Sequence, residues 1–265
     1  TGVQTCALPI LDRHAVLVFR GQSLDDEAQA RFVGGLGPLF VGLRRVNGAL
    51  HRTALAAVSD VSNLDEDGNV VGPATRKMYS QLANQLWHSD GSFVKPAARY
   101  STLYSVTRPG AGGETEFADT RAGYDALPDE LKAQIAGLGA EHFALHSRIA
   151  LGYTGYSADE MKILPPVEWP IVRTLPTGRK ALYIGAHATH VTGMNVAQGR
   201  LLLAELLERA TQPAFVYRHA WQAGDLVMWD NRCTLHRGLR YDLRQKRELR
   251  RVATEDGDVP RAQAA

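Results

Sequence analysis

The placement of two short histidine motifs is the strongest constraint on how this chain can fold. His88 and Asp90 lie in QLWHSDGSF, and His236 lies far downstream in LVMWDNRCTLHRG. In a strand, residues i and i+2 project to the same side, so His88 and Asp90 can face one metal ion together. The third ligand, His236, must then come from a distant strand, which we expect the fold to bring to the same point.

The residue types in these motifs favour a non-haem iron(II) centre. Two neutral imidazoles and one carboxylate can cap one face of the metal and leave the opposite face open for a chelating cosubstrate and oxygen. Trp87 and Phe93 flank the H-x-D pair with apolar bulk that would screen the metal from water, and Gly91 would let another group approach closely. Each motif is weak by itself, because nine histidines make such a pair common and a single histidine is more often a surface or core residue.

Two arginines after His236 strengthen this interpretation. Arg247 and Arg251 lie in RQKRELRR, and their separation is even, so in a strand both would face the same side. A guanidinium offers a planar, two-pronged match to a carboxylate, as binding of dianionic 2-oxoglutarate requires. A second anion-binding arginine suggests that the substrate is also an acid. Without the histidine motifs, a solvated basic stretch would be the preferred reading.

Length and charge set the organisation and the partners that we expect. The 265 residues fit one large domain, predicted over 11–256, with a C-terminal tail over 257–265. The first ten residues lack a starting methionine, and we expect 1–10 to be a truncated or non-native beginning. A formal charge of +2 implies no nucleic-acid partner, and no apolar run is long enough for a membrane span. The only cysteines, Cys6 and Cys233, form no disulfide framework, so we expect the cytoplasm. Whether the chain forms a homo-oligomer is left open at this point.

Hydrophobic periodicity predicts a mainly β protein with helices. Helices are expected after an N-cap at Ser23 as far as Val33, within 124–138 with Pro128 at the helix start, and over 196–210. The polar stretch 41–80 reads as long loops over a site entrance. Together the pattern favours a double-stranded β-helix (jelly roll) core with helical and loop insertions. Strands are expected over 15–20, 99–107, 114–119, 141–146, 181–185, 215–220, 225–230, 234–239 and 249–254.

Longer stretches carry a resemblance to a known family. They are NQLWHSDGSF, PAARYSTLYSV, GGETEFADTRAGYDALP, GRLLLAELLERATQPAFVYRH, GDLVMWDNRCTLHRGLRYD and RELRR. On these stretches, the chain from residue 15 to about 254 resembles the taurine dioxygenase family of Fe(II)/2-oxoglutarate dioxygenases. Within that family it is most similar to members that act on aryloxyacetic acids. The resemblance implies that the enzyme uses Fe(II), 2-oxoglutarate and O2.

The resemblance also implies roles for individual residues. Iron would be bound by His88, Asp90 and His236. Thr115 would hydrogen-bond the distal carboxylate of 2-oxoglutarate, and Arg247 would form a salt bridge with it. Substrate-binding roles would fall to Arg251 for the acid group, to Asn84 for an amide contact, and to His187 and His190 on a loop beside the substrate ring. Arg45 would take the place of a lysine that helps to hold the substrate carboxylate in aryloxyacetate-cleaving relatives, which keeps the charge but changes the geometry.

The activity implied by the resemblance is oxidative ether cleavage. Hydroxylation of an aryloxyacetate beside its ether oxygen gives an unstable hemiacetal that collapses to a phenol and glyoxylate, while 2-oxoglutarate becomes succinate and CO2. The same chemistry on an alkanesulfonate such as taurine, or on a 2-aryloxypropionate, is the alternative. Two rivals come from other classes: a catalytically silent binding protein with a jelly-roll core, and a zinc hydrolase using the same ligands. The zinc reading leaves Thr115 and the two arginines unexplained.

Overall fold

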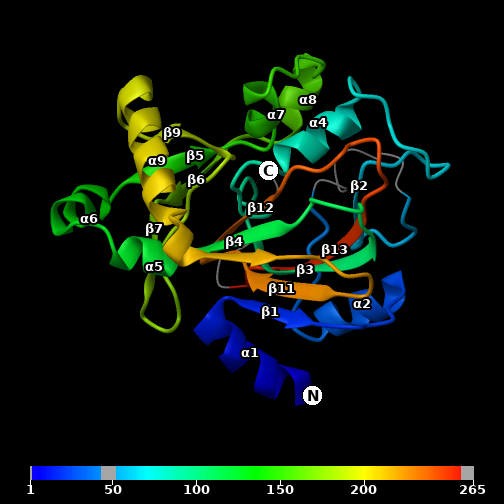
Figure 1. Ribbon diagram of the computed structural model, residues 1–265. Coiled ribbons are helices and arrows are strands. Elements are labelled where there is room, and N and C mark those ends of the chain that lie inside the picture. The colour runs from blue at the N-terminus through cyan, green and yellow to red at the C-terminus, as the bar shows by residue number, and fades with distance from the viewer. Residues whose placement is uncertain (1, 43–51, 258–265) are drawn as a thin grey trace.

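A five-stranded antiparallel sheet forms the larger half of the core in the computed structural model, which describes residues 2–42 and 52–257 (Figure 1). Its central strand β3 pairs with β11 on one side and β13 on the other, so strands from the middle and the end of the chain lie together. In spatial order the strands are β1 (Val16–Phe19), β11 (Leu226–Asp230), β3 (Ala98–Thr107), β13 (Glu248–Glu255) and β2 (Ser59–Ser62).

A three-stranded antiparallel sheet faces the larger one. It consists of β10 (Val216–His219), β4 (Thr115–Asp119) and β12 (Thr234–Gly238), in that order. Alternate side chains of both sheets point inward, where Phe117 packs with Leu103, Trp229 and Leu249 in one hydrophobic cluster. The β12 register places His236 opposite Phe117, so the third predicted ligand faces the space between the sheets. The predicted jelly-roll core is confirmed.

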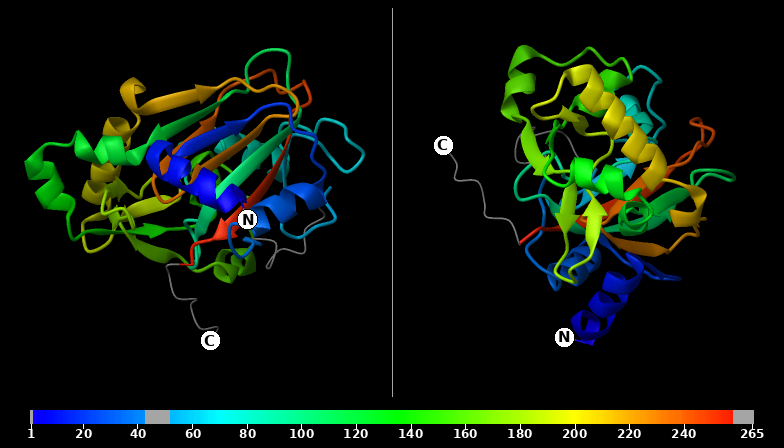
Figure 2. Two further views of the ribbon diagram at one scale, coloured as in Figure 1. Left: turned by 90° about the horizontal axis from the view of Figure 1, so that it is seen from below. Right: turned by 90° about the vertical axis from the view of Figure 1, so that its left-hand side faces the viewer.

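A second layer of elements lies beside this core. One small sheet contains β6 (Val167–Pro170), β5 (Gly139–His142) and β9 (Ala188–Val191), and another contains β7 (Val172–Thr174) and β8 (Lys180–Leu182). Helix α9 (Val196–Ala210) packs against β9 and against α5 (Thr120–Asp125) (Figure 2). Their shared apolar interior includes Leu182, Leu206 and Leu235, the last of which comes from β12 next to His236. This layer therefore supports the metal-facing strand from outside.

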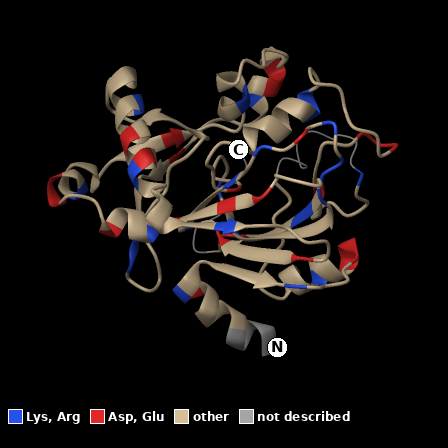
Figure 3. Ribbon diagram, viewed as in Figure 1, with Lys and Arg blue, Asp and Glu red and all other residues tan. Residues whose placement is uncertain are grey.

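The remaining helices cover the ends and edges of the sheets. Helix α1 (Gly2–His14) packs on β1 and β11, where Leu11 is fully buried. Helix α2 (Asp26–Gly34) packs on β13. Helices α4 (Arg76–Ala83) and α7 (His146–Ala150) contact each other at the top of Figure 1, with α8 (Ala158–Ile163) nearby. Acidic and basic residues are interspersed along the ribbon, as the near-balanced charge predicts (Figure 3).

Most predicted strands and one helix agree with the structure. The helix predicted over 196–210 has those bounds as α9, because Asn195 caps its first turn and leucines line its buried face. Of the predicted strands, 99–107, 114–119, 225–230, 234–239 and 249–254 match β3, β4, β11, β12 and β13 within a residue or two. Strands 15–20, 181–185 and 215–220 are found as the shorter β1, β8 and β10, the last preceded by a short 3-10 helix, Pro213–Phe215.

Three local predictions, on the cap of α2, the strand at 141–146 and the stretch 41–80, were wrong. Helix α2 starts later than expected because Asp25, rather than Ser23, accepts the hydrogen bond of the first turn from the Ala28 N–H. The helix expected within 124–138 is confirmed as α6 (Asp129–Ile135), which begins directly after Pro128, although it ends before Leu138. The strand expected over 141–146 is β5, which begins and ends earlier. Within 41–80, the described part contains β2 and the start of α4, so it is not only loop.

Candidate active site

The two histidine motifs meet as the sequence predicted. One nitrogen each from His88 and His236 and one carboxylate oxygen from Asp90 lie within 4.8 Å of one another, and all three residues are buried. An isolated β-bridge joins the motifs: the His88 N–H donates to the His236 carbonyl over 3.0 Å, and the His236 N–H donates back over 2.9 Å. The premise that the pair lies in a regular strand was wrong, since Asp90 begins a turn just after the bridge. The short extended segment still directs both side chains to one point.

Asp90 is held in place by residues that sequence reasoning missed. The Asn231 Oδ1 accepts the Asp90 N–H over 3.0 Å, and the Asn231 Nδ2 donates to the Ser101 Oγ over 2.8 Å. Ser101 in turn donates to the Asp90 Oδ2 over 2.8 Å. All three residues are buried. The only sequence signal was a polar residue directly after the buried strand LVMWD, and hydrogen bonding of a ligating carboxylate by such neighbours fixes its orientation.

Gly91 shapes the turn that carries Asp90. Its φ is +64°, in the left-handed region that favours glycine. A Cβ at this position would lie 2.7 Å from the Phe40 ring and 2.9 Å from the Ala98 nitrogen. The expected close approach of another group is therefore observed, and that group is the β3 backbone with the Phe40 side chain.

The protonation states of the three candidate ligands suit metal binding. Burial, reinforced by the nearby His88, lowers the pKa of His236 to about 3, and burial lowers the pKa of His88 as well, so both imidazoles are neutral near pH 7. Burial alone would raise the pKa of Asp90, but Arg251 and the two histidines outweigh it and the pKa falls below its usual range. The site thus presents two neutral nitrogens and one carboxylate without prior loss of a proton.

The donor set fits a divalent metal such as iron(II). The His88 Nδ1 lies 2.7 Å from the Leu86 carbonyl, which can only accept, so Nδ1 carries the proton and Nε2 is free to ligate. The His236 Nε2 lies 3.9 Å from the Asp90 Oδ1, which turns this nitrogen toward the same point. Its Nδ1 is buried with no hydrogen-bond partner in the described part of the chain.

A cavity of about 180 Å³ opens next to these three residues. Thr115, Arg247 and Arg251, all predicted site residues, line it together with Asn84, which caps the end of α4. Residues that line the cavity, apart from these and the three candidate ligands, are Ser59, Asp60, Val61, Ser80, Gln81, Leu103, Arg148, Gly238 and Leu249. The even spacing of the two arginines does bring both to one side of the last strand, although Arg247 lies one residue before β13 begins.

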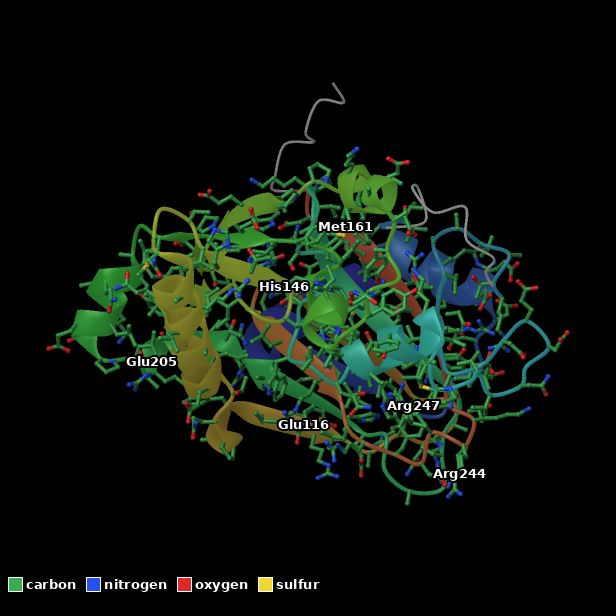
Figure 4. All side chains as sticks on the ribbon, turned by 90° about the horizontal axis from the view of Figure 1, so that it is seen from above. Glu116, His146, Met161, Glu205, Arg244 and Arg247 are labelled. Atoms are coloured by element: carbon green, nitrogen blue, oxygen red, sulfur yellow. The ribbon has the colours of Figure 1, made fainter. Side chains whose placement is uncertain are left out.

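Arg247 is a buried cation without a counter-ion. Its Nε and Nη2 donate to the Gly113 carbonyl over 3.3 and 3.2 Å, and no carboxylate in the described ranges forms an ion pair with it. Burial lowers the pKa of its guanidinium, which still remains charged. Arg247 lies inside the molecule while Arg244 lies at its edge (Figure 4). The Thr115 Oγ1 accepts a hydrogen bond of 3.0 Å from Trp221. A carboxylate ligand would supply the charge that Arg247 lacks.

Arg251 contacts one of the candidate metal ligands, Asp90, directly. Its Nη1 donates to the Asp90 Oδ1, the same oxygen that lies nearest His236. The side chain is only partly buried, with 28% exposed, and its tip reaches the cavity from β13.

The structure places the other residues predicted to contact the substrate, Arg45, His187 and His190, in three different situations. Arg45 lies outside the described residues. His187 is buried, and its ring lies 4.8 Å from the Phe93 ring and 6.2 Å from the His88 ring. Its Nδ1 has no hydrogen-bond partner among the described residues. His187 does not line the cavity. His190 lies on β9, where its Nδ1 is 2.8 Å from Thr189 and 3.8 Å from Glu141. The expected contact of His190 with the substrate ring has no support in this geometry.

Known proteins match nearly the whole chain. The family model for the taurine catabolism dioxygenase TauD, TfdA family matches residues 8–253. An alpha-ketoglutarate-dependent 2,4-dichlorophenoxyacetate dioxygenase of Burkholderia sp. (strain RASC) is 55% identical over 245 residues, which cover 92% of this chain and 82% of that protein. An (S)-phenoxypropionate/alpha-ketoglutarate-dioxygenase of Sphingobium herbicidovorans is 34% identical over 244 residues, which cover 88% of this chain and 79% of that protein.

Solved structures agree with these relatives. The crystal structure of AAD-2 in complex with Mn(II) and N-oxalylglycine has a TM-score of 0.89 and 42% identity, with 99% of this chain and 90% of that chain covered. A jelly roll with a buried centre of two histidines and one carboxylate is the frame of a non-haem metal oxygenase. The chain belongs to the TauD, TfdA family of dioxygenases, which confirms the resemblance seen in the sequence. Among the described residues, none of the helices has the length and apolar character to cross a membrane.

Proposed function

We propose that this chain is an Fe(II)- and 2-oxoglutarate-dependent dioxygenase that hydroxylates an aryloxyacetic acid beside its ether oxygen. The observation that carries the proposal is the shared cavity: three buried metal-binding side chains and two arginines face one space. The names of the relatives support both the cosubstrate and the substrate class. N-oxalylglycine, bound in AAD-2, is 2-oxoglutarate with one methylene replaced by N–H, which further supports the cosubstrate.

In this proposal the metal is held by His88, Asp90 and His236. Bound iron(II), with O2 and 2-oxoglutarate, supplies the oxidising chemistry that converts a substrate C–H to C–OH while the keto acid becomes succinate and CO2. The ring nitrogens need no deprotonation because burial keeps both imidazoles neutral. Asn231 and Ser101 keep the carboxylate oriented. The protein contributes orientation and exclusion of water, which are its main means of catalysis here.

The cosubstrate is proposed to bind through its distal carboxylate to Arg247 and Thr115. The guanidinium is buried and lacks an ion pair among the described residues, so a carboxylate is its natural partner. Thr115 lies on β4 and lines the same cavity. Anchoring the far end of the keto acid in this way leaves its keto and C1 carboxylate groups directed at the metal-binding side chains.

The substrate acid is proposed to bind to Arg251, with Asn84 contributing a polar contact. Asp90 now pairs with Arg251, and metal binding would engage that carboxylate and free the guanidinium for an anion. Holding the acid group at a set distance from the metal selects which carbon reacts. Hydroxylation of the carbon beside the ether oxygen gives a hemiacetal, which collapses to a phenol and glyoxylate without a hydrolytic residue.

A 2-aryloxypropionate is the second candidate substrate. The relative from Sphingobium herbicidovorans is named for phenoxypropionate, and the same anchors would serve that acid. An alkanesulfonate such as taurine is a third, since the family takes its name from taurine and a sulfonate also matches a guanidinium. We propose the cytoplasm as the compartment, supported by the buried free thiol of Cys233.

A substrate screen tests the proposal. Fe(II)-loaded protein is incubated with 2-oxoglutarate, O2 and a panel of aryloxyacetates, 2-aryloxypropionates and alkanesulfonates, and succinate, phenol and oxygen uptake are measured. We expect succinate release and oxygen uptake to be stimulated most by an aryloxyacetate, with phenol formed in equal amount. Asp90→Ala is the matched control and should be inactive. If no acid in the panel stimulates succinate release, the dioxygenase proposal is refuted. Product formation without oxygen uptake would favour a hydrolase.

A further inference from the structure

Arg148 is a second cation without a counter-ion in the same cavity, and no motif in the sequence pointed to it. It lies on the short helix α7, and it lines the cavity with Arg251. Its Nη1 donates to the Ala144 carbonyl over 3.1 Å and to the Ser147 Oγ over 3.3 Å. Its Nε donates to the Ser80 Oγ of α4 over 3.5 Å. These neutral partners hold the guanidinium in place but leave its charge unbalanced.

No carboxylate is available to balance that charge within the described ranges. The cavity contains two carboxylates, Asp60 and Asp90. Asp60 pairs with Lys77 over 2.7 Å, and Asp90 pairs with Arg251. The Nη2 of Arg148 makes no hydrogen bond to any described residue. Burial of a guanidinium is unfavourable unless a partner supplies the opposite charge, so an anionic ligand is the expected partner.

The position of Arg148 distinguishes the substrate from the cosubstrate as that ligand. Among the lining residues, Thr115 begins β4 and Arg247 lies directly before β13. Arg148 comes from α7, which lies with α4 above β4 and β13 in Figure 1, and the α4 residues Ser80 and Gln81 line the same cavity. Arg148 shares the cavity with the candidate ligands His88 and Asp90 and with the proposed substrate anchor Arg251.

We propose that Arg148 is a second substrate-binding arginine, which together with Arg251 holds the acid group of the organic acid. This inference rests on the proposed function and specifies how the substrate is recognised. Two guanidiniums around one oxyanion would favour acids over neutral molecules of the same shape, because a neutral group would leave both charges unpaired. The geometry suits any oxyanion, a carboxylate or a sulfonate alike.

Binding to an inert metal form tests the proposal without turnover. Protein loaded with Mn(II) and 2-oxoglutarate is titrated by calorimetry with an aryloxyacetate and with the matching 2-aryloxyethanol, which has the same ring and ether but no charge. In Arg148→Met we expect affinity for the acid to fall about tenfold or more, as for loss of a charged hydrogen bond, and affinity for the alcohol to stay within about twofold. Arg148→Lys keeps the charge and should recover part of the loss.

Arg76→Met is the matched control. Arg76 is partly exposed on α4, pairs with Glu160 and lies near Arg148, yet it does not line the cavity. Its loss removes one positive charge from the same neighbourhood and should leave both affinities unchanged. Equal losses for acid and alcohol in Arg148→Met, or a loss confined to 2-oxoglutarate, would overturn the inference. If the wild-type protein bound none of the acids, the proposed function itself would fail, whereas normal wild-type binding with an unaffected Arg148→Met would refute this inference alone.

Discussion

Arg251 and Asp90 form an ion pair across the candidate metal site, from β13 to the turn that follows His88. The oxygen of Asp90 that Arg251 contacts is also the one nearest the His236 Nε2. A metal ion bound by the three side chains would also engage the Asp90 carboxylate. Arg251 and such an ion would therefore compete for the same carboxylate.

This relationship predicts that Arg251→Gln binds metal more tightly than the wild type. Without Arg251, no cationic side chain competes for the Asp90 carboxylate, and the site carries one positive charge fewer to repel the metal ion. We expect Mn(II) affinity to rise by about 3- to 10-fold, as for loss of a partly exposed charge interaction of about 1 kcal/mol. Tryptophan fluorescence or equilibrium dialysis measures the Mn(II) affinity of each variant. Arg247→Gln, whose side chain does not contact Asp90, is the control, and a weaker metal affinity in Arg251→Gln would contradict the competition.

The two arginines should affect different ligands. We expect Arg251→Ala to raise the KM for the aryloxyacetate about 10- to 100-fold with little change in the KM for 2-oxoglutarate, and Arg247→Ala to do the reverse. The reason is that each guanidinium supplies a charge-assisted contact to a different acid. Steady-state kinetics in which either the aryloxyacetate or 2-oxoglutarate is varied gives the KM for each. Equal effects of the two changes on both constants would contradict this division.

Asn231 should be required for metal affinity although it is not a ligand. It accepts the Asp90 N–H and donates to Ser101, and both contacts are buried. In Asn231→Ala we expect the free energy of unfolding to fall by about 2 to 3 kcal/mol and metal affinity to fall about 10- to 100-fold. Asn195→Ala is the control: it removes the N-cap of α9 and should cost about 1 kcal/mol without changing metal affinity. Similar metal affinity in the two variants would refute the positioning role.

His142 should make the metal-free protein less stable in acid. Burial lowers the pKa of His142 to about 3, with its Nδ1 lying 3.1 Å from the Ser92 Oγ. Between this value and the ordinary pKa of about 6.5, the unfolded chain binds a proton that the folded chain does not, so stability falls as the pH falls through that window. In His142→Gln the slope of unfolding free energy between pH 4 and 6 should decrease by about 1.4 kcal/mol per pH unit.

Urea unfolding of the metal-free protein at several pH values measures that slope. Ser92→Ala is the matched variant, because it removes the hydrogen-bond partner of His142 but no titratable group. It should lower stability at every pH and leave the slope as in the wild type. An unchanged slope in His142→Gln would show that other groups account for the acid sensitivity.

Local pattern and ligand chemistry were enough to predict that His88, Asp90 and His236 meet at one point, and they predicted much of the fold. The i and i+2 spacing of His88 and Asp90, the even spacing of Arg247 and Arg251, and the leucine periodicity of α9 are all properties of short segments. Resemblance over the long matching stretches supplied Thr115 and Asn84, and both line the cavity. Periodicity decides which side chains of a regular strand or helix share a face, as it does for Arg247 and Arg251 at the last strand and for the leucines of α9.

Tertiary structure decided which remote groups meet these side chains. Asn231 reaches Asp90 across 141 positions in the chain, and Arg251 reaches the same residue across 161. Arg148 faces the cavity only because α7 packs on α4, and His190 turns away toward Glu141 because β9 pairs with β5. No local spacing encodes such contacts. The sequence alone determined the chemistry of the candidate metal-binding residues, and the closure of the two sheets determined which hydrogen bonds and charges surround them.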